Sequence, residues 1–148
     1  MSIQRKALAD TYRDIREKAI EKIKNHSDLT DVKDIIFGEK KRVGSLNTPA
    51  IWIVPSAHVP QLRGGHTAQH NIPLDFVTFV KHYEPQEGLK QAQDLALRIY
   101  DVILEDRTLD GLVNDVKPTR VDPAYEIGQS KQVYWSAVQF EFSLQRRE

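Results

Sequence analysis

Among the residues of this chain, two histidines come nearest to the spacing of a catalytic or metal-binding site. His66 and His70 lie four residues apart, so a helix would bring both imidazoles to one face, as some zinc sites require. However, Gly64-Gly65 precedes the pair, no glutamate stands at the catalytic offset, and an apolar strand is predicted to begin by Ile72. We therefore interpret His66 and His70 as loop residues and predict no metal site.

Other catalytic chemistries lack their usual residue patterns. None of Ser56, Ser130 and Ser136 lies in the Gly-x-Ser-x-Gly turn that exposes a nucleophile. Gly64-Gly65 is not followed by the Lys-Ser/Thr pair of a phosphate-binding loop. The chain has no cysteine, which excludes thiol catalysis and disulfides. The sequence therefore predicts no catalytic residue and no cofactor, and we expect a protein that is not an enzyme.

One enzymatic alternative stays open at this point. A small metal-dependent enzyme or ligand-binding module would build its site from His58, His66, His70 and Asp75, provided that the fold brings them together. His82 stands at the end of an apolar strand, where a packed or hydrogen-bonded histidine is more typical than a ligand.

Positive charge is concentrated in two short runs, Lys40-Lys41-Arg42 and Arg146-Arg147. The whole chain has 21 Lys and Arg against 21 Asp and Glu, whereas a protein that grips phosphates usually has a basic excess. A solvated turn and a chain end explain these runs, or they pair with an acidic neighbouring subunit. The residues predicted to bind a partner are Lys40, Lys41, Arg42, Arg63, His66 and His70.

The composition is that of one globular domain, residues 1–148. The chain has 148 residues, of which 40% are hydrophobic and 28% charged, enough for a single core. No apolar run approaches the length of a membrane span, so no membrane partner is expected. The first residues lack the apolar core of a secretory signal, and the absence of cysteine suits a reducing compartment; both favour the cytoplasm.

Two segments have the three- and four-residue apolar spacing of amphipathic helices. The first is predicted over Gln4–Asn25 and the second over Gln86–Glu105. The apolar stripe of the second helix consists of Leu89, Ala92, Leu95, Ala96, Ile99, Tyr100 and Ile103.

The remaining periodic segments read as strands. Short strands are expected within Asp34–Val43 and over Ala50–Val54, a long one over Ile72–Tyr83, and two more over Asn114–Arg120 and Val133–Leu144. Ile72–Tyr83 is apolar on both faces, which predicts either a central strand or a strand with one face on a helix and the other on a partner subunit. The predicted fold is α+β, an antiparallel (mixed) sheet of about four strands with two main helices packed on one face.

The segment Ser56–Asn71 contains Pro60 and Gly64-Gly65 and has no clear period. We predict a loop there, and a loop of this length in a compact domain is usually functional, or disordered when free.

The order of elements resembles the bacteriophage tail terminator (tail completion) proteins. The matching features are the strand start Pro49-Ala50-Ile51-Trp52-Ile53, the turn Asp106–Gly111 after the second helix, and the last strand with Trp135. The resemblance covers residues 1–148 in element order, and the motifs that carry it are short.

The resemblance implies a structural protein that forms a homo-oligomeric ring, expected to be a hexamer. Such a ring caps the last ring of tail tube protein, stops polymerisation and presents a joining surface to the head–neck connector protein, with DNA only passing through its lumen. The expected location is the tail or neck of the virion, after assembly in the host cytoplasm. The loop Ser56–Asn71 and the segment Gly38–Leu46 would reach the tube or the neighbouring subunit. A head–neck connector (adaptor) of the same virion is the near alternative.

Overall fold

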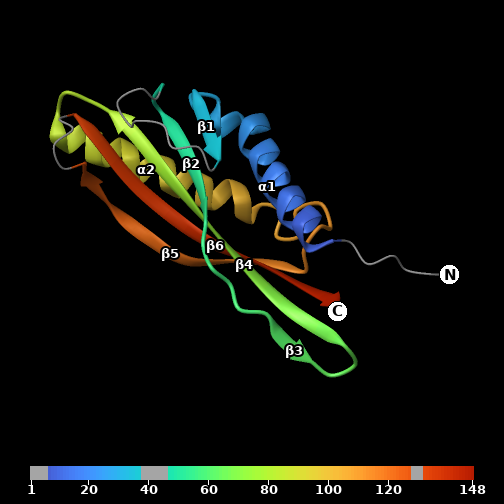
Figure 1. Cartoon of the computed structure of the whole chain (residues 1–148). Helices are drawn as coiled ribbons and strands as arrows, with labels where there is room; N and C mark the ends of the chain where they lie inside the picture. Colours follow the sequence, from blue (N-terminus) through green and yellow to red (C-terminus); the bar gives the residue numbers. More distant parts are fainter. Residues whose placement is uncertain (1–6, 38–46, 128–131) are drawn as a thin grey trace.

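Two amphipathic helices cover one face of a mixed β-sheet in the computed structural model (Figure 1). The structure describes residues 7–37, 47–127 and 132–148. Within these ranges the elements follow in the order α1 (Leu8–Asn25), a short 3-10 helix η1 (Ser27–Leu29), β1 (Asp34–Phe37), β2 (Ala50–Pro55), β3 (Gln61–Arg63), β4 (Thr67–Lys81), α2 (Pro85–Leu104), β5 (Asp115–Glu126) and β6 (Val133–Arg147).

The sheet has the strand order β1-β2-β4-β6-β5, and β3 pairs with β4. β1 and β2 are parallel, and the other neighbours are antiparallel. The α+β prediction is therefore confirmed. The sheet contains six strands in the described residues, rather than about four, and β3 is the strand that sequence analysis left out.

The helices form where the apolar spacing predicted them. α1 ends at Asn25 as predicted, while the first residues of the predicted segment, before residue 7, lie outside the described ranges. α2 differs from its predicted bounds by one residue at each end, and Pro85 occupies its first turn, where no N–H is needed. Neither helix in the described ranges is both long and apolar enough to cross a lipid bilayer.

The core lies between the helices and the two longest strands, β4 and β6, which pair along all 15 residues of β4. Phe76 of β4 and Phe140 of β6 are fully buried, with their rings 5.7 Å apart in an edge-to-face arrangement. Phe142 lies in the same cluster with Leu95 and Ile99 of α2. The apolar stripe predicted for the second helix therefore packs on one face of β6.

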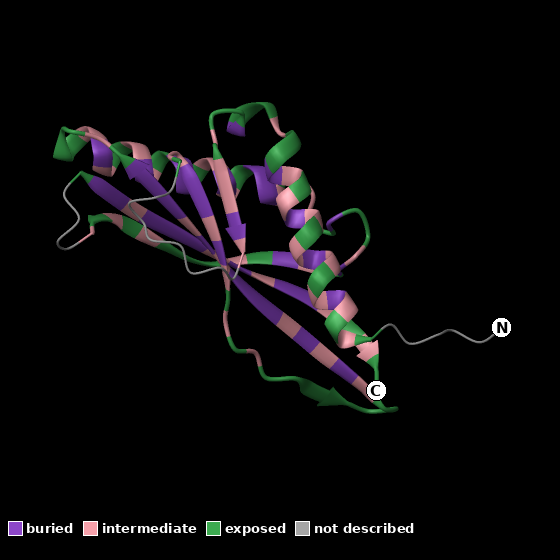
Figure 2. Cartoon of the chain, turned by 45° about the horizontal axis from the view of Figure 1, so that its top comes forward, coloured by how far each residue is buried: buried purple, intermediate pink, exposed green. Residues whose placement is uncertain are grey.

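β4 begins at Thr67 and not at Ile72, so the second half of the predicted loop Ser56–Asn71 is a strand. Buried and half-buried residues alternate along it (Figure 2), because successive side chains point to opposite faces of the sheet. Ala68 and His70 point toward the core, although neither is a strong strand former. β3 pairs with Thr67–Gln69 and is exposed at all three residues.

The turn after α2 is held by the carboxylate of Asp106. That carboxylate accepts hydrogen bonds from the backbone N–H groups of Thr108 and Asp110. Gly111 has φ +87°, a backbone conformation that glycine adopts more readily than other residues. Lys22 of α1 lies 3.0 Å from the Asp106 carboxylate and holds its pKa well below the usual range. The turn therefore ties α1 to the end of α2.

Candidate functional site

The face of the sheet opposite the helices, here called the helix-free face, has an apolar half. The side chains in this apolar patch enclose an open groove of about 460 Å³. No helix of the described residues packs over the patch, and its members come from β2, β4, β6 and the end of β5. They are Trp52, Val54, Val77, Phe79, Ile127 and Trp135.

The apolar patch follows directly from strand alternation. Odd-numbered residues of β4 lie on the helix-free face, and the register places Val77 opposite Trp52 and Phe79 opposite Trp135. Trp52 and Phe79 are in ring contact at 6.3 Å. Phe79 is buried, whereas Trp52 and Trp135 are only half-buried. The prediction that the long strand is apolar on both faces is confirmed, and the structure leaves one of those faces partly open.

The other half of the helix-free face is polar. Arg120 of β5 lies 3.3 Å from Asp75 of β4 and 3.0 Å from Asp122. Farther along β4, the hydroxyl of Ser143 donates to the side chain of Asn71 at 2.7 Å. Asp75 Oδ1 is buried and has no hydrogen-bond partner among the described residues. The apolar patch is therefore bordered along β4 by the ion pair of Asp75 and Arg120.

A second feature is the β-hairpin formed by β3 and the start of β4, here called the arm (residues 59–69). The arm lies at the far end of β4 from α2 (Figure 1). Val59 and Leu62 are 80% and 82% exposed. Gly65 and His66 make the tight turn with φ values of +76° and +62°. In the described part of the chain β3 pairs with β4 alone, so its outer edge is open to another strand.

A hydrogen-bonded row of side chains fastens the base of the arm. The hydroxyl of Tyr12 in α1 contacts His58 Nδ1. His58 Nε2 lies 3.1 Å from His70 Nδ1, and His70 Nε2 lies 2.8 Å from a carboxylate oxygen of Glu148. Arg146 contacts the other oxygen of Glu148 at 3.3 Å. The row therefore joins α1, the segment before the arm, β4 and the end of β6.

The environment of the row favours the neutral form of His58. Burial lowers the pKa of His58, and the neighbouring His70 lowers it further. Burial also raises the pKa of the Tyr12 hydroxyl. One of two neighbouring imidazoles must accept the hydrogen bond between them, so the row requires that at least one of them be uncharged.

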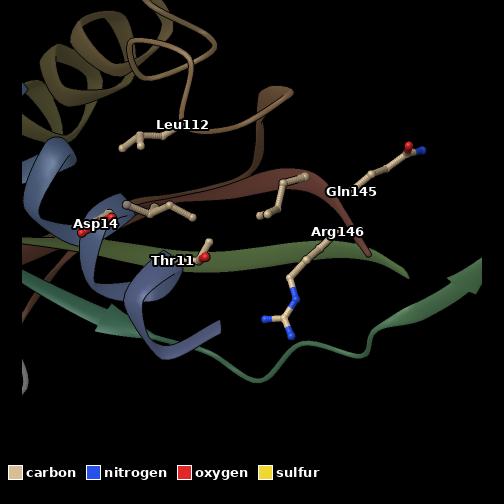
Figure 3. Close-up of a pocket in the computed structure, with 7 residues that line it drawn as sticks. Thr11, Asp14, Leu112, Gln145 and Arg146 are labelled. Atoms are coloured by element: carbon tan, nitrogen blue, oxygen red, sulfur yellow. The ribbon is translucent and has the colours of Figure 1, made fainter. Parts of the chain in front are cut away.

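A small cavity of about 180 Å³ lies beside this row, between α1 and the end of β6 (Figure 3). Thr11 and Asp14 of α1 line it together with Leu112 and Arg146. The Arg146 side chain is 13% exposed, and its Nε and Nη1 atoms have no hydrogen-bond partner among the described residues. Because the cavity contains charges of both signs, it is not selective for either an anion or a cation.

The structure places the predicted partner-binding residues in three different environments. Lys40, Lys41 and Arg42 lie outside the described residues. Arg63 and His66 are exposed on the arm. His70 is 2% exposed, so its placement in a loop was wrong, and its imidazole is occupied inside the chain.

The residues of the enzymatic alternative separate in the fold. His58 and His70 are neighbours, whereas His66 lies at the tip of the arm and Asp75 lies on the opposite face of the sheet from His70. Within the described ranges no group of three His, Cys, Asp or Glu residues is arranged to hold a metal ion. Sequence reasoning missed Tyr12 and Glu148, since nothing local in the sequence links them to the histidines.

Comparison with known proteins adds no family assignment to this geometry. No protein-family model and no curated protein matches the sequence. A function must therefore be argued from the apolar patch, the arm and the hydrogen-bonded row at its base.

Proposed function

We propose that this chain is a structural protein of a bacteriophage virion, with the role of a tail terminator. Copies of it would form a ring that caps the tail tube, stops its polymerisation and offers a joining surface to the head–neck connector. The observation that carries the proposal is the apolar patch on the helix-free face. The resemblance in element order supplies the identity of the assembly.

The apolar patch supports a protein-binding role because no part of the described chain fully covers its apolar side chains. Two half-buried tryptophans and an adjoining groove expose apolar area that a folded chain usually covers. Aromatic side chains are also enriched at the centres of protein interfaces. The same side chains sit on rigid central strands, so a partner would bind them with little loss of conformational freedom.

A ring suits such a surface better than an open chain of subunits. A single contact repeated between different surfaces of neighbouring copies closes into a ring when the rotation allows it, and a closed ring leaves no unpaired contact. A tube that grows by stacking rings exposes the same recruiting surface at its end after every addition. A cap ends growth if it binds that surface without recreating it, so the mechanism is steric and needs no catalytic residue.

The proposal is tested by deleting the gene from the phage genome that encodes this chain. We expect filled heads without tails, and tail tubes of irregular or excessive length. Purified protein added to the defective extract should restore joining. Tails of normal length already joined to heads would refute the terminator role, and tails of normal length that remain unjoined would assign the chain to the connector instead.

A matched pair of variants connects this phenotype to the apolar patch. Val54→Lys places a charge at the open side of the patch, opposite Asp75 and not opposite a like charge, whereas Leu97→Lys places the same charge on α2, at a leucine that is 46% exposed. We expect both proteins to fold with similar thermal midpoints, and only Leu97→Lys to restore joining. Restoration by Val54→Lys would show that the patch is not a contact surface.

A further inference from the structure

We infer that the arm of one copy docks on the apolar patch of the next copy, so that a single head-to-tail contact repeats around the ring. This inference rests on the proposed ring and specifies the contact that builds it. Three observations carry it: the exposed apolar residues of the arm, the position of the patch, and the open edge of β3.

The arm presents apolar side chains that its own chain does not cover. Val59, just before β3, is 80% exposed, and Leu62, within β3, is 82% exposed. All three residues of β3 are exposed (Figure 2). A single exposed leucine is ordinary on a protein surface. Two large apolar residues on one narrow projection, however, form a knob that fits a groove on another molecule.

The arm is too far from the apolar patch of its own chain to fill it. Leu62 pairs with Ala68 near the start of β4, whereas Val77 of the patch lies nine residues farther along the same strand. A strand rises about 3.4 Å per residue, which separates the two by about 30 Å. The knob and the groove therefore lie at opposite ends of one rigid strand. In a head-to-tail row of copies, each knob would face the groove of its neighbour.

The outer edge of β3 offers a second kind of contact. No other strand of the described chain pairs with its outer backbone N–H and C=O groups, so these groups can form hydrogen bonds with the neighbouring copy. A symmetric contact of patch against patch would leave the arm and its two apolar side chains in water. The head-to-tail contact covers both surfaces in one step.

The absence of cysteine in this chain makes a direct test possible. One protein carries Leu62→Cys on the arm, and a second, enlarged by a tag, carries Val54→Cys in the patch. The two are mixed under mild oxidation, at concentrations where light scattering detects oligomers and again in assembled particles. We expect a mixed disulfide several-fold above that of Leu62→Cys mixed with the control Leu97→Cys. A disulfide forms only when the two Cα atoms come within about 7 Å, so Val59→Cys and a short bis-maleimide linker are used in parallel.

Each outcome decides the question. A mixed product confined to the arm and patch pair supports the inference. Dimers of Val54→Cys with itself as the main product would show patch-against-patch contact, and yields equal to the control in every pair would show that the arm binds elsewhere; either result overturns the inference. The gene deletion tests the phage role separately. Cross-linking without a tail phenotype would refute the proposed function alone, and a tail phenotype without cross-linking would refute the inference alone.

Discussion

Gly88→Ala should have two opposite effects on the stability of the protein. It should raise helix propensity, and it should crowd the packing of α2. Gly88 lies in the first turns of α2, where its N–H donates to the carbonyl of Glu84 at 2.9 Å. Alanine in place of glycine in a helix usually stabilises it by about 0.8–1.0 kcal/mol. Helix propensity alone therefore predicts a more stable protein.

Packing against Tyr134 opposes this gain. A Cβ atom at position 88 would lie within 3.0 Å of three ring atoms of Tyr134, including Cγ at 2.9 Å. Tyr134 is 2% exposed and lies among Val80 and Ala92, so the ring has little room to move. Overpacking of a buried site typically costs about 1–3 kcal/mol. We expect the packing cost to exceed the propensity gain, with a net loss of about 1 kcal/mol in the free energy of unfolding.

Urea denaturation measures this difference as a shift of the midpoint at constant slope. Gly64→Ala is the matched control, because a Cβ at position 64 meets no atom within 4 Å, and it should change stability by less than about 0.5 kcal/mol. In a Tyr134→Ala background, Gly88→Ala should become neutral or stabilising, since the ring that it strikes is gone. A Gly88→Ala protein that is more stable than the parent would refute the close packing of α2 on β6.

Two further predictions concern the core and the base of the arm. Phe140→Ala should lower the free energy of unfolding by about 3–5 kcal/mol, because Phe140 is fully buried against Phe76; a loss below about 1 kcal/mol in urea denaturation would show that this face is not core. Protonation should loosen the row at the arm. The folded-state pKa of His58 lies below its ordinary value of 6.5, so the unfolded chain takes up the proton first as the pH falls. The stability due to neutral His58 is then complete above about 6.5 and is lost as the pH falls toward the folded-state pKa. Thermal midpoints measured across this interval should fall less steeply for His58→Gln, and equal slopes would contradict the role given to His58.

The elements that sequence analysis predicted well are those whose pattern is local. α2 has its apolar residues at helical spacing and begins at a proline, and Val133–Leu144 alternates along most of its length. Each pattern is complete within one segment, so it needs no knowledge of the neighbours. The two-sided apolar pattern of Ile72–Tyr83 also agreed with the central position of β4, which lies between β2 and β6 in the sheet.

The parts that sequence analysis missed depend on contacts between distant segments. β3 is three residues long, polar at two of them and exposed, so no apolar period marks it. The first residues of β4 contain Ala68 and His70, which become strand residues because β6 pairs with both and β3 also pairs with Ala68. The row from Tyr12 to Glu148 joins residues 78 positions apart at its last link. Such a row is visible only after the chain has folded.

The two faces of β4 have different roles, and this difference bears directly on the proposed ring. Its even-numbered side chains, such as Phe76, fill the core beneath the helices, while the odd-numbered Val77 and Phe79 carry the apolar patch. The arm continues the same strand beyond the helices. Because the residues that stabilise the fold and the residues proposed for assembly alternate along one backbone, an exposed arm residue such as Leu62 can change without emptying the core. Assembly and folding should therefore be separable by single substitutions. If every variant of the arm and patch that blocks assembly also unfolds the protein, the two surfaces serve the fold and not a partner.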